Sequence, residues 1–370
     1  MSSENKTRRQ HYVPNCLLKG FVGSKGKIDV FRIPENKYLP NQATENHFVQ
    51  SWLYDTDNLA ENFFSDYIES PASPVFERLR IDSNAVISFE ERKNLIFFIA
   101  CQWGRTLQAY DESVDYVSKI LFSMAETKAI ETGRDDLLPF EGNVVISPKG
   151  VEGERATRVN IAAQAVHSAL LLFDLEMKIL QNNTGRSLIV SDNPVILYNS
   201  LYAKLNPFQV RSLTSRGVQL FLPISIDKCL CLYDSAIYKY GTKKSQTVEA
   251  TLNDVDFLNQ LQMRFAQQLI AYPSDKMKLY VARLANSYFG KKVFEARKIS
   301  FSKIDKELGV ERVFAGVGSS QRDISLAFSF VKRRKKSKKY EGSYLERNPK
   351  LSAEGRLDFK EILSKTKRLP

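Results

Sequence analysis

Hydrophobic and polar positions follow a helical period through most of the first half of this chain. Apolar residues recur every three or four positions over 59–79, 95–107 and 110–132, which predicts three helices. The stretch 95–107 is apolar on nearly all sides, so we expect it to form a central buried helix. Ser88 and Glu91 have the spacing of a capping box, so this helix is expected to begin just after Ser88.

Two local features modify this helical half. Pro71 and Pro74 fall inside the 59–79 stretch, and we expect them to interrupt its helix at 70–74. Residues 27–32 alternate between polar and apolar side chains, which is typical of a half-buried strand. Turn sequences lie on both sides of that strand, so an amino-terminal hairpin is expected.

The pattern changes after a loop-like stretch at 135–154 that contains several prolines and glycines. We expect long helices over 156–182 and 247–271, where the apolar stripe again has helical spacing. Short apolar runs predict strands at 187–190, 195–198, 218–223 and 229–233, with closing strands at 293–301 and 324–331. The chain is therefore expected to have an α+β fold, with a largely helical first half and a mostly antiparallel sheet in the second.

Composition narrows the class of protein. With 370 residues, 43% of them hydrophobic and 11% aromatic, the chain is long enough to bury a full core. We expect one globular domain over 1–331, loosely divided into 1–135 and 155–331, followed by a tail over 332–370. No apolar run approaches the roughly 18 to 20 residues of a membrane span, and the amino terminus lacks the apolar core of a secretion signal. The four cysteines lie among apolar neighbours, as reduced thiols of a cytoplasmic protein do.

The positive charge is concentrated at the carboxyl end. The chain carries 54 − 42 = +12, of which residues 332–370 carry 14 − 5 = +9, so the rest carries only 12 − 9 = +3. Seven cations fall within eight positions: Lys332, Arg333, Arg334, Lys335, Lys336, Lys338 and Lys339. Such a block repels itself, so we expect a disordered basic tail that binds nucleic acid. A solvated tail without a partner is the equally weighted alternative.

The most distinctive polar positions follow an apolar run in the middle of the chain. Residues 188–190 are Leu, Ile and Val, and Ser191, Asp192, Asn193 and a proline come next. Asp and Asn accept turn conformations, and a residue before proline is held extended. We therefore expect a buried strand that presents the Asp192 carboxylate and the Asn193 carboxamide at its end, where a ligand can be held.

Three further side chains are candidates for the same site. His11 lies close to two arginines, and neighbouring cations lower a histidine pKa, which keeps the ring neutral as a base or ligand requires. Arg105 ends the buried helix and needs an anionic partner, which is a ligand, Glu69 or Asp192. Structural roles stay open: His11 bonding a backbone carbonyl, Arg105 in an internal salt bridge, and Glu69 at a solvated helix end.

Two motifs make the chain resemble a known family. Residues 10–14 read Gln-His-Tyr-Val-Pro and residues 191–195 read Ser-Asp-Asn-Pro-Val, with Phe-Leu-Pro-Ile-Ser at 221–225. Over roughly residues 8 to 275 the chain resembles the bacterial family catalogued as domain of unknown function 4238. The resemblance implies that Glu69 and Arg105 occupy the family's polar positions. It implies no mechanism, and the chain departs from the pattern after Ser225, where the family has proline.

Three functions are compatible with these residues. The first is acid–base hydrolysis of nucleic acid in a defence or mobile-element system. In it His11 is the base or a ligand, Asp192 and Glu69 are acids or ligands, and Arg105 stabilises phosphate charge. The other two are nucleic-acid binding without catalysis through the tail, and a scaffold or ligand-sensing protein.

The cofactor of such a hydrolase is left open by the sequence. A divalent metal ion is one alternative, although the chain contains no standard metal-ligand motif. A single site that contains both His11 and Asp192 requires segment 10–14 to pack directly beside the turn at 191–195. We predict that it does.

Overall fold

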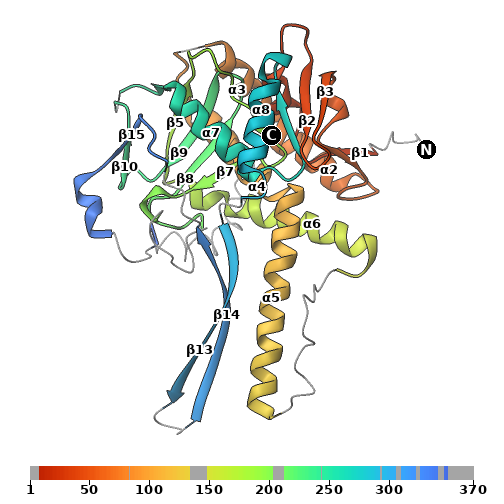
Figure 1. Cartoon of the computed structure of the whole chain (residues 1–370), viewed down its shortest axis with the longest axis vertical. Helices are drawn as coiled ribbons and strands as arrows, with labels where there is room; N and C mark the ends of the chain where they lie inside the picture. Colours follow the sequence, from red (N-terminus) through yellow and green to blue (C-terminus); the bar gives the residue numbers. More distant parts are fainter. Residues whose placement is uncertain are drawn as a thin grey trace, which may run out of the picture.

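The computed structural model describes residues 8–82, 84–133, 148–202, 212–242, 244–291, 294–305, 310–321, 326–340 and 346–348. These residues form a body of helices and sheets. One long helix, α5 (Leu107–Thr132), and one hairpin of β13 (Phe294–Asp305) and β14 (Val310–Gln321) project from it side by side (Figure 1). The fold is α+β as predicted, and most strand pairs are antiparallel.

The predicted central helix is α4 (Phe89–Gly104), and most of its apolar residues are buried. The Ser88 hydroxyl accepts the Glu91 N–H and the Glu91 carboxylate accepts the Ser88 N–H, so the predicted capping box is confirmed. Helix α6 (Gly150–His167) packs across the other end of α4. A Cβ at Gly104 would lie 2.3 Å from a carbon of α6, so this close approach requires glycine.

The helix that precedes α4 is continuous, so the predicted break at 70–74 is wrong. It consists of α2 (Leu59–Phe63), a π-helical turn η3 (Phe64–Glu69) and α3 (Ser70–Ile81). In the widened turn the Ser70 N–H bonds the Ser65 carbonyl five residues back. Pro71 comes directly after the π-helical turn, at the start of α3, and Pro74 lies inside α3.

The predicted helix 156–182 is wrong in its second half. α6 and the turn η5 (Ser168–Leu172) are followed by a strand, β5 (Glu176–Gln181). Every position of β5 after Glu176 is buried, and β5 pairs with a strand on each side. Pairing and burial on both faces therefore outweigh the helical spacing of its apolar residues.

Two larger sheets complete the body. The five-stranded sheet has the order β11 (Thr247–Glu249), β5, β9 (Lys228–Tyr233), β8 (Gln219–Pro223) and β7 (Ile196–Tyr198), with β11 and β5 parallel and the other pairs antiparallel. The four-stranded sheet has the order β3 (Lys37–Gln42), β2 (Ile28–Arg32), β12 (Leu269–Tyr272) and β6 (Val190–Ser191). Because β12 and β2 are neighbours, the two halves of the chain share this sheet.

The predicted helix 247–271 is too long, because both of its ends are strands. α7 (Leu252–Phe265) begins at a capping box of Thr251 and Asp254 and lies between β11 and β12. The predicted strand 293–301 is part of the hairpin β13–β14, and β15 (Val331–Arg333) takes only the end of 324–331. The other elements are β1 (Arg9–His11), α1 (Asn15–Leu18), η1 (Lys19–Phe21), η2 (Thr44–Asn46), β4 (Val49–Ser51), η6 (Ser200–Tyr202), β10 (Tyr238–Tyr240), η7 (Asp275–Met277), α8 (Lys278–Tyr288) and η8 (Lys335–Tyr340).

The basic run at 332–339 is folded onto the body, where the sequence predicted the start of a disordered tail. β15 pairs with β10, and η8 follows it. The Arg334 side chain donates to the Ser235 carbonyl at 2.7 Å, and Ser337 is fully buried. Backbone pairing thus overcomes repulsion among the lysines, whose side chains stay exposed. The predicted tail beyond residue 348 lies outside the described residues.

These contacts predict that a chain ending at Phe330 is less stable than one ending at Asn348. The longer chain keeps the β10–β15 pairing and the Arg347 side chain, which donates to Asp174 at 2.7 Å. With each hydrogen bond contributing roughly 0.5–1.5 kcal/mol, we expect the shorter chain to melt several degrees lower. Differential scanning calorimetry of the two truncated chains measures this, and equal melting temperatures would contradict the docking.

Candidate functional site

Three of the predicted site residues lie together where β1, η3 and the end of α4 meet. His11 is the last residue of β1, Glu69 is the last residue of η3, and Arg105 follows α4. The charges of Glu69 and Arg105 both act on the His11 ring. The structure therefore brings His11, Glu69 and Arg105 into one cluster, with Glu69 rather than Asp192 as the partner of Arg105.

The Arg105 guanidinium is buried and only partly satisfied. Its side chain is 1% exposed, its Nη1 donates to Glu69 Oε1 at 2.7 Å, and its Nε donates to Gln102 Oε1 at 2.8 Å. Its face lies over the Phe64 ring, 5.7 Å from the centroid. Burial alone would lower the pKa of Arg105, but Glu69 outweighs it and raises the pKa, so the cation persists. The buried Nη2 has no hydrogen-bond partner within the described part of the chain.

His11 has the second unsatisfied atom of the cluster. Its Nε2 is buried and has no partner among the described residues. Burial is the main cause that lowers the pKa of His11 below its ordinary 6.5; Arg105 and Arg9 lower it further, and Glu69 opposes them. The ring is therefore neutral at pH 7, as the sequence predicted, although burial contributes more than the neighbouring cations.

Glu61 is a member of the cluster that the sequence reasoning missed. It lies on α2 and is half-buried, and burial, together with the charge of Glu69, raises its pKa from 4.5 to about 7. The His11 backbone N–H bonds the Glu61 carboxylate and partly offsets this rise. The signal available in the sequence was spacing, because residues 61 and 69 are eight apart and so lie near one face of a continuous helix.

The Asp192 carboxylate binds the backbone at the start of β12. Its Oδ1 accepts the Gln267 N–H at 2.8 Å, and its Oδ2 accepts the N–H groups of Gln268 and Leu269 at 2.6 and 3.1 Å. These bonds fix the start of β12. Burial raises the pKa of Asp192 from 3.8 to about 6, although the three N–H bonds oppose the rise. Each oxygen of this carboxylate is thus already bonded, which leaves it poorly placed to bind a ligand.

Asn193 and Ser191 are also held by the protein. The Asn193 amide donates to Gln108 at 2.9 Å, and Thr106 donates to the Asn193 carbonyl oxygen at 3.4 Å. The Ser191 hydroxyl and N–H both donate to Gln262 of α7. The turn is therefore bound on one side by α7 and on the other by the start of α5.

The two sequence motifs both approach the end of α4. Gln102 donates to the Tyr12 carbonyl at 2.9 Å and also accepts from Arg105. The Asp192 charge, after burial, raises the pKa of the Tyr12 hydroxyl, so the carboxylate lies near that ring. The motifs are neighbours, but His11 belongs to the unsatisfied cluster, and Asp192 and Asn193 belong to a satisfied network.

In the described part of the chain, no group of three or more His, Cys, Asp or Glu side chains is placed to hold a metal ion. The cluster offers an imidazole, two carboxylates and a guanidinium. These groups are sufficient for proton transfer and for binding a negatively charged oxygen.

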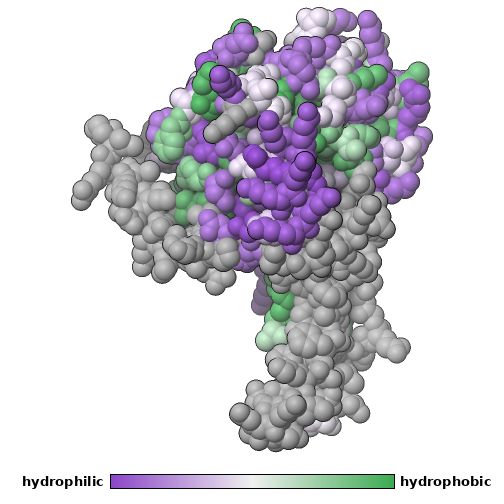
Figure 2. Space-filling view, turned by 90° about the vertical axis from the view of Figure 1, so that its left-hand side faces the viewer, coloured by the Kyte–Doolittle hydropathy of each residue, from purple (hydrophilic) through white to green (hydrophobic). Residues whose placement is uncertain are grey.

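The basic run forms a separate surface. Lys332, Lys335 and Lys336 are exposed, as are Lys338 and Lys339, and they follow β15 into η8. β15 and β10 lie on the opposite side of the body from β1 and α2 (Figure 1). The view onto this side shows a mostly hydrophilic face (Figure 2). The cluster and the basic surface are thus two distinct sites.

A family model covers most of the chain. It is described as protein of unknown function (DUF4238) and matches residues 9–276, which include both motifs. The chain belongs to this family. No curated protein and no solved structure matches it. Within the DUF4238 chain, no helix of the described residues is long and apolar enough to cross a membrane.

The network around Asp192 predicts a stability effect. In Asp192→Asn the new NH₂ group faces backbone N–H donors, so we expect a loss of roughly 1–3 kcal/mol in the free energy of unfolding. The folded carboxyl has the higher pKa, so its contribution is complete below pH 3.8 and is lost as pH rises through about 6. The deficit of the variant should therefore be larger at pH 4 than at pH 7.

Denaturant unfolding at both pH values tests this, with the exposed Asp66→Asn as the matched control. A variant as stable as the parent chain would show that the three N–H bonds contribute nothing.

Proposed function

We propose that this DUF4238 protein is a hydrolase that cleaves phosphodiesters by acid–base catalysis at the cluster of His11, Glu61, Glu69 and Arg105. The observation that carries the proposal is the pair of buried, unpartnered nitrogens, His11 Nε2 and Arg105 Nη2, beside a carboxyl group with a pKa of about 7. A purely structural cluster would be expected to satisfy these atoms internally.

In the proposed hydrolysis, each side chain of the cluster has one role. Neutral His11 accepts a proton from water at Nε2 while the water oxygen bonds the phosphorus atom. Protonated Glu61 gives its proton to the leaving oxygen as the P–O bond breaks, and Arg105 Nη2 donates to a non-bridging oxygen. Glu69 holds Arg105 in place. Solvent then returns both groups to their starting protonation states.

Exposed aromatic rings favour nucleic acid as the substrate. Phe63 and Tyr67 lie on α2 and η3 and are 41% and 71% exposed, and their rings stack at a centroid distance of 5.5 Å. Such rings can stack with bases of a single strand. Residues 55–69 carry five acidic side chains and no Lys or Arg, so attraction for the polyanion has to come from elsewhere on the molecule.

The second candidate function is nucleic-acid binding without catalysis, and the exposed lysines of β15 and η8 favour it. Their ordered backbone fixes the spacing of the charges before a ligand binds, which lowers the entropic cost of association. A cytoplasmic location is part of both proposals, because nucleic acid is abundant there.

Replacement of the proposed base should abolish hydrolysis. We expect His11→Gln to lower kcat on bis-p-nitrophenyl phosphate and on single-stranded oligonucleotides by about 10²-fold or more, because general bases contribute about 10²–10⁴-fold. Glu61→Gln should also lower kcat, because it removes the proposed acid, and should abolish the further loss of activity that the parent chain shows above about pH 7, where Glu61 ionises. His167→Gln, on the last residue of α6, is the matched control. Unchanged activity in His11→Gln would reject the proposed mechanism.

Nucleic-acid binding should depend on five lysines. If Lys332, Lys335, Lys336, Lys338 and Lys339 each neutralise one phosphate, the log–log salt slope is about −3.5 to −4.5, from roughly 0.7–0.9 counterions per contact. Fluorescence anisotropy with a labelled oligonucleotide measures it. Replacement of all five lysines by glutamine should make the salt slope less steep. A slope that stays steep in this fivefold variant would place the binding surface elsewhere on the protein.

A further inference from the structure

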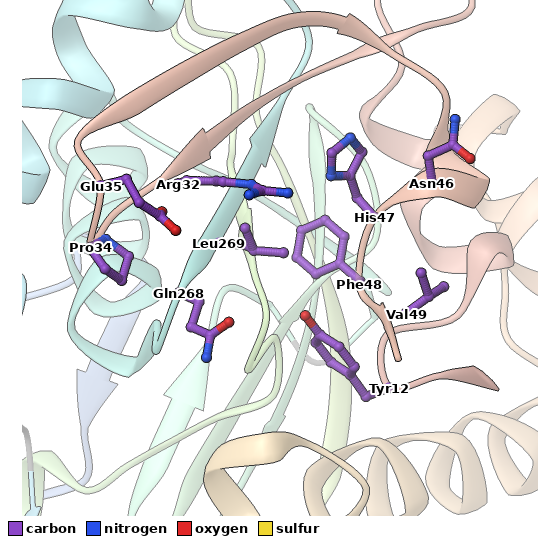
Figure 3. Close-up of a pocket in the computed structure, with 10 residues that line it drawn as sticks. All are labelled: Tyr12, Arg32, Pro34, Glu35, Asn46, His47, Phe48, Val49, Gln268 and Leu269. Atoms are coloured by element: carbon purple, nitrogen blue, oxygen red, sulfur yellow. The ribbon is translucent and has the colours of Figure 1, made fainter. Parts of the chain in front are cut away.

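A cavity of about 410 Å³ lies beside Tyr12 and is separate from the proposed hydrolytic cluster. Its walls come from four segments: Tyr12 of the first motif, Arg32 at the end of β2 with Pro34 and Glu35, residues 46–49 before and within β4, and Gln268 with Leu269 at the start of β12 (Figure 3). Segments far apart in sequence thus enclose one space.

Three polar groups that can donate hydrogen bonds converge on this cavity. Figure 3 shows the Arg32 side chain extending into it and the Tyr12 hydroxyl pointing toward it from another side. Neither the Arg32 guanidinium nor the Tyr12 hydroxyl nor the Gln268 carboxamide has a hydrogen-bond or ion-pair partner among the described residues. Tyr12 is 3% exposed, whereas Arg32 and Gln268 are exposed residues of the lining. Three donors from separate segments, none of them bonded to a described residue, can therefore be shared by one anionic ligand.

Phe48 and Leu269 give the cavity an apolar wall between these donors. Burial, Arg32 and Arg9 all lower the pKa of His47, so this ring is neutral and does not cancel the anion preference. The carboxylate in the lining is Glu35, which is exposed, as Arg32 is, and forms no ion pair with Arg32.

We propose that this cavity binds a small organic anion, a carboxylate or phosphate monoester attached to a ring. Arg32 holds the anionic group, the Tyr12 hydroxyl and the Gln268 amide donate to its oxygens, and the ring lies on Phe48 and Leu269. The backbone around the site is fixed in advance, because Asp192 bonds the N–H groups of Gln268 and Leu269. This site is independent of the proposed hydrolase activity.

Calorimetric titration of the full chain with phenyl phosphate, benzoate and phenol tests the proposal. We expect phenyl phosphate or benzoate to bind with one-to-one stoichiometry, and phenol to bind at least about tenfold more weakly, because it lacks the anionic group. Comparison of the two anions then identifies whether phosphate or carboxylate is preferred.

Variants of the lining residues locate the site. Arg32→Gln should raise the Kd of the preferred anion at least about tenfold and Tyr12→Phe severalfold, whereas Glu35→Gln should lower it by removing like charge. Arg283→Gln, at an exposed position of α8 outside the cavity, is the matched control. Equal Kd values for Arg32→Gln and the parent chain, or binding of neither anion, would overturn the proposal. Weaker binding in Glu35→Gln would assign the cavity to a zwitterion and would also overturn it.

Discussion

The buried ion pair of Arg105 and Glu69 is the interaction on which the candidate site depends. A guanidinium that is 1% exposed requires an anionic partner, and Glu69 supplies it from the end of a π-helical turn. Gln102 takes a second edge of the guanidinium and also holds the Tyr12 carbonyl, which ties the first motif to the central helix. The remaining edge, Nη2, is left without a partner among the described residues, beside a neutral histidine. The positive charge of the site is therefore held at the end of α4 by Glu69 and Gln102.

The second motif serves the architecture around this site. Asp192 binds the backbone at the start of β12, and β12 is the strand that joins the two halves of the chain in one sheet. Asn193 and Ser191 attach the same turn to α5 and α7 through Gln108 and Gln262. The first motif thus contributes an unpartnered His11 ring nitrogen, whereas the polar groups of the second motif are hydrogen-bonded within the protein.

Much of the fold could be predicted from periodicity and local chemistry. The buried stretch 95–107 and the Ser88 cap predicted α4, and short apolar runs predicted the strands at 218–223 and 229–233. Failures occurred where tertiary pairing competes with local pattern: residues 176–181 have helical spacing but pair on both sides, and the lysine run pairs with β10 despite its charge. Within the site, three of five residues were placed together correctly. Glu61 was missed although the helix predicted from residue 59 contained both Glu61 and Glu69, because its burial beside His11 is a tertiary contact that spacing does not show.

The central claim is that His11 is a neutral ring within the field of Arg105 and Glu69, and titration of the three histidines by nuclear magnetic resonance tests it most directly. The account predicts a His11 pKa below 6.5, because burial and Arg105 lower it, and a further decrease in Glu69→Gln, because Glu69 is the charge that opposes them. His11→Gln assigns the signal. A His11 pKa at or above 6.5, or one that does not change in folded Glu69→Gln, would show that the ring is not part of this cluster.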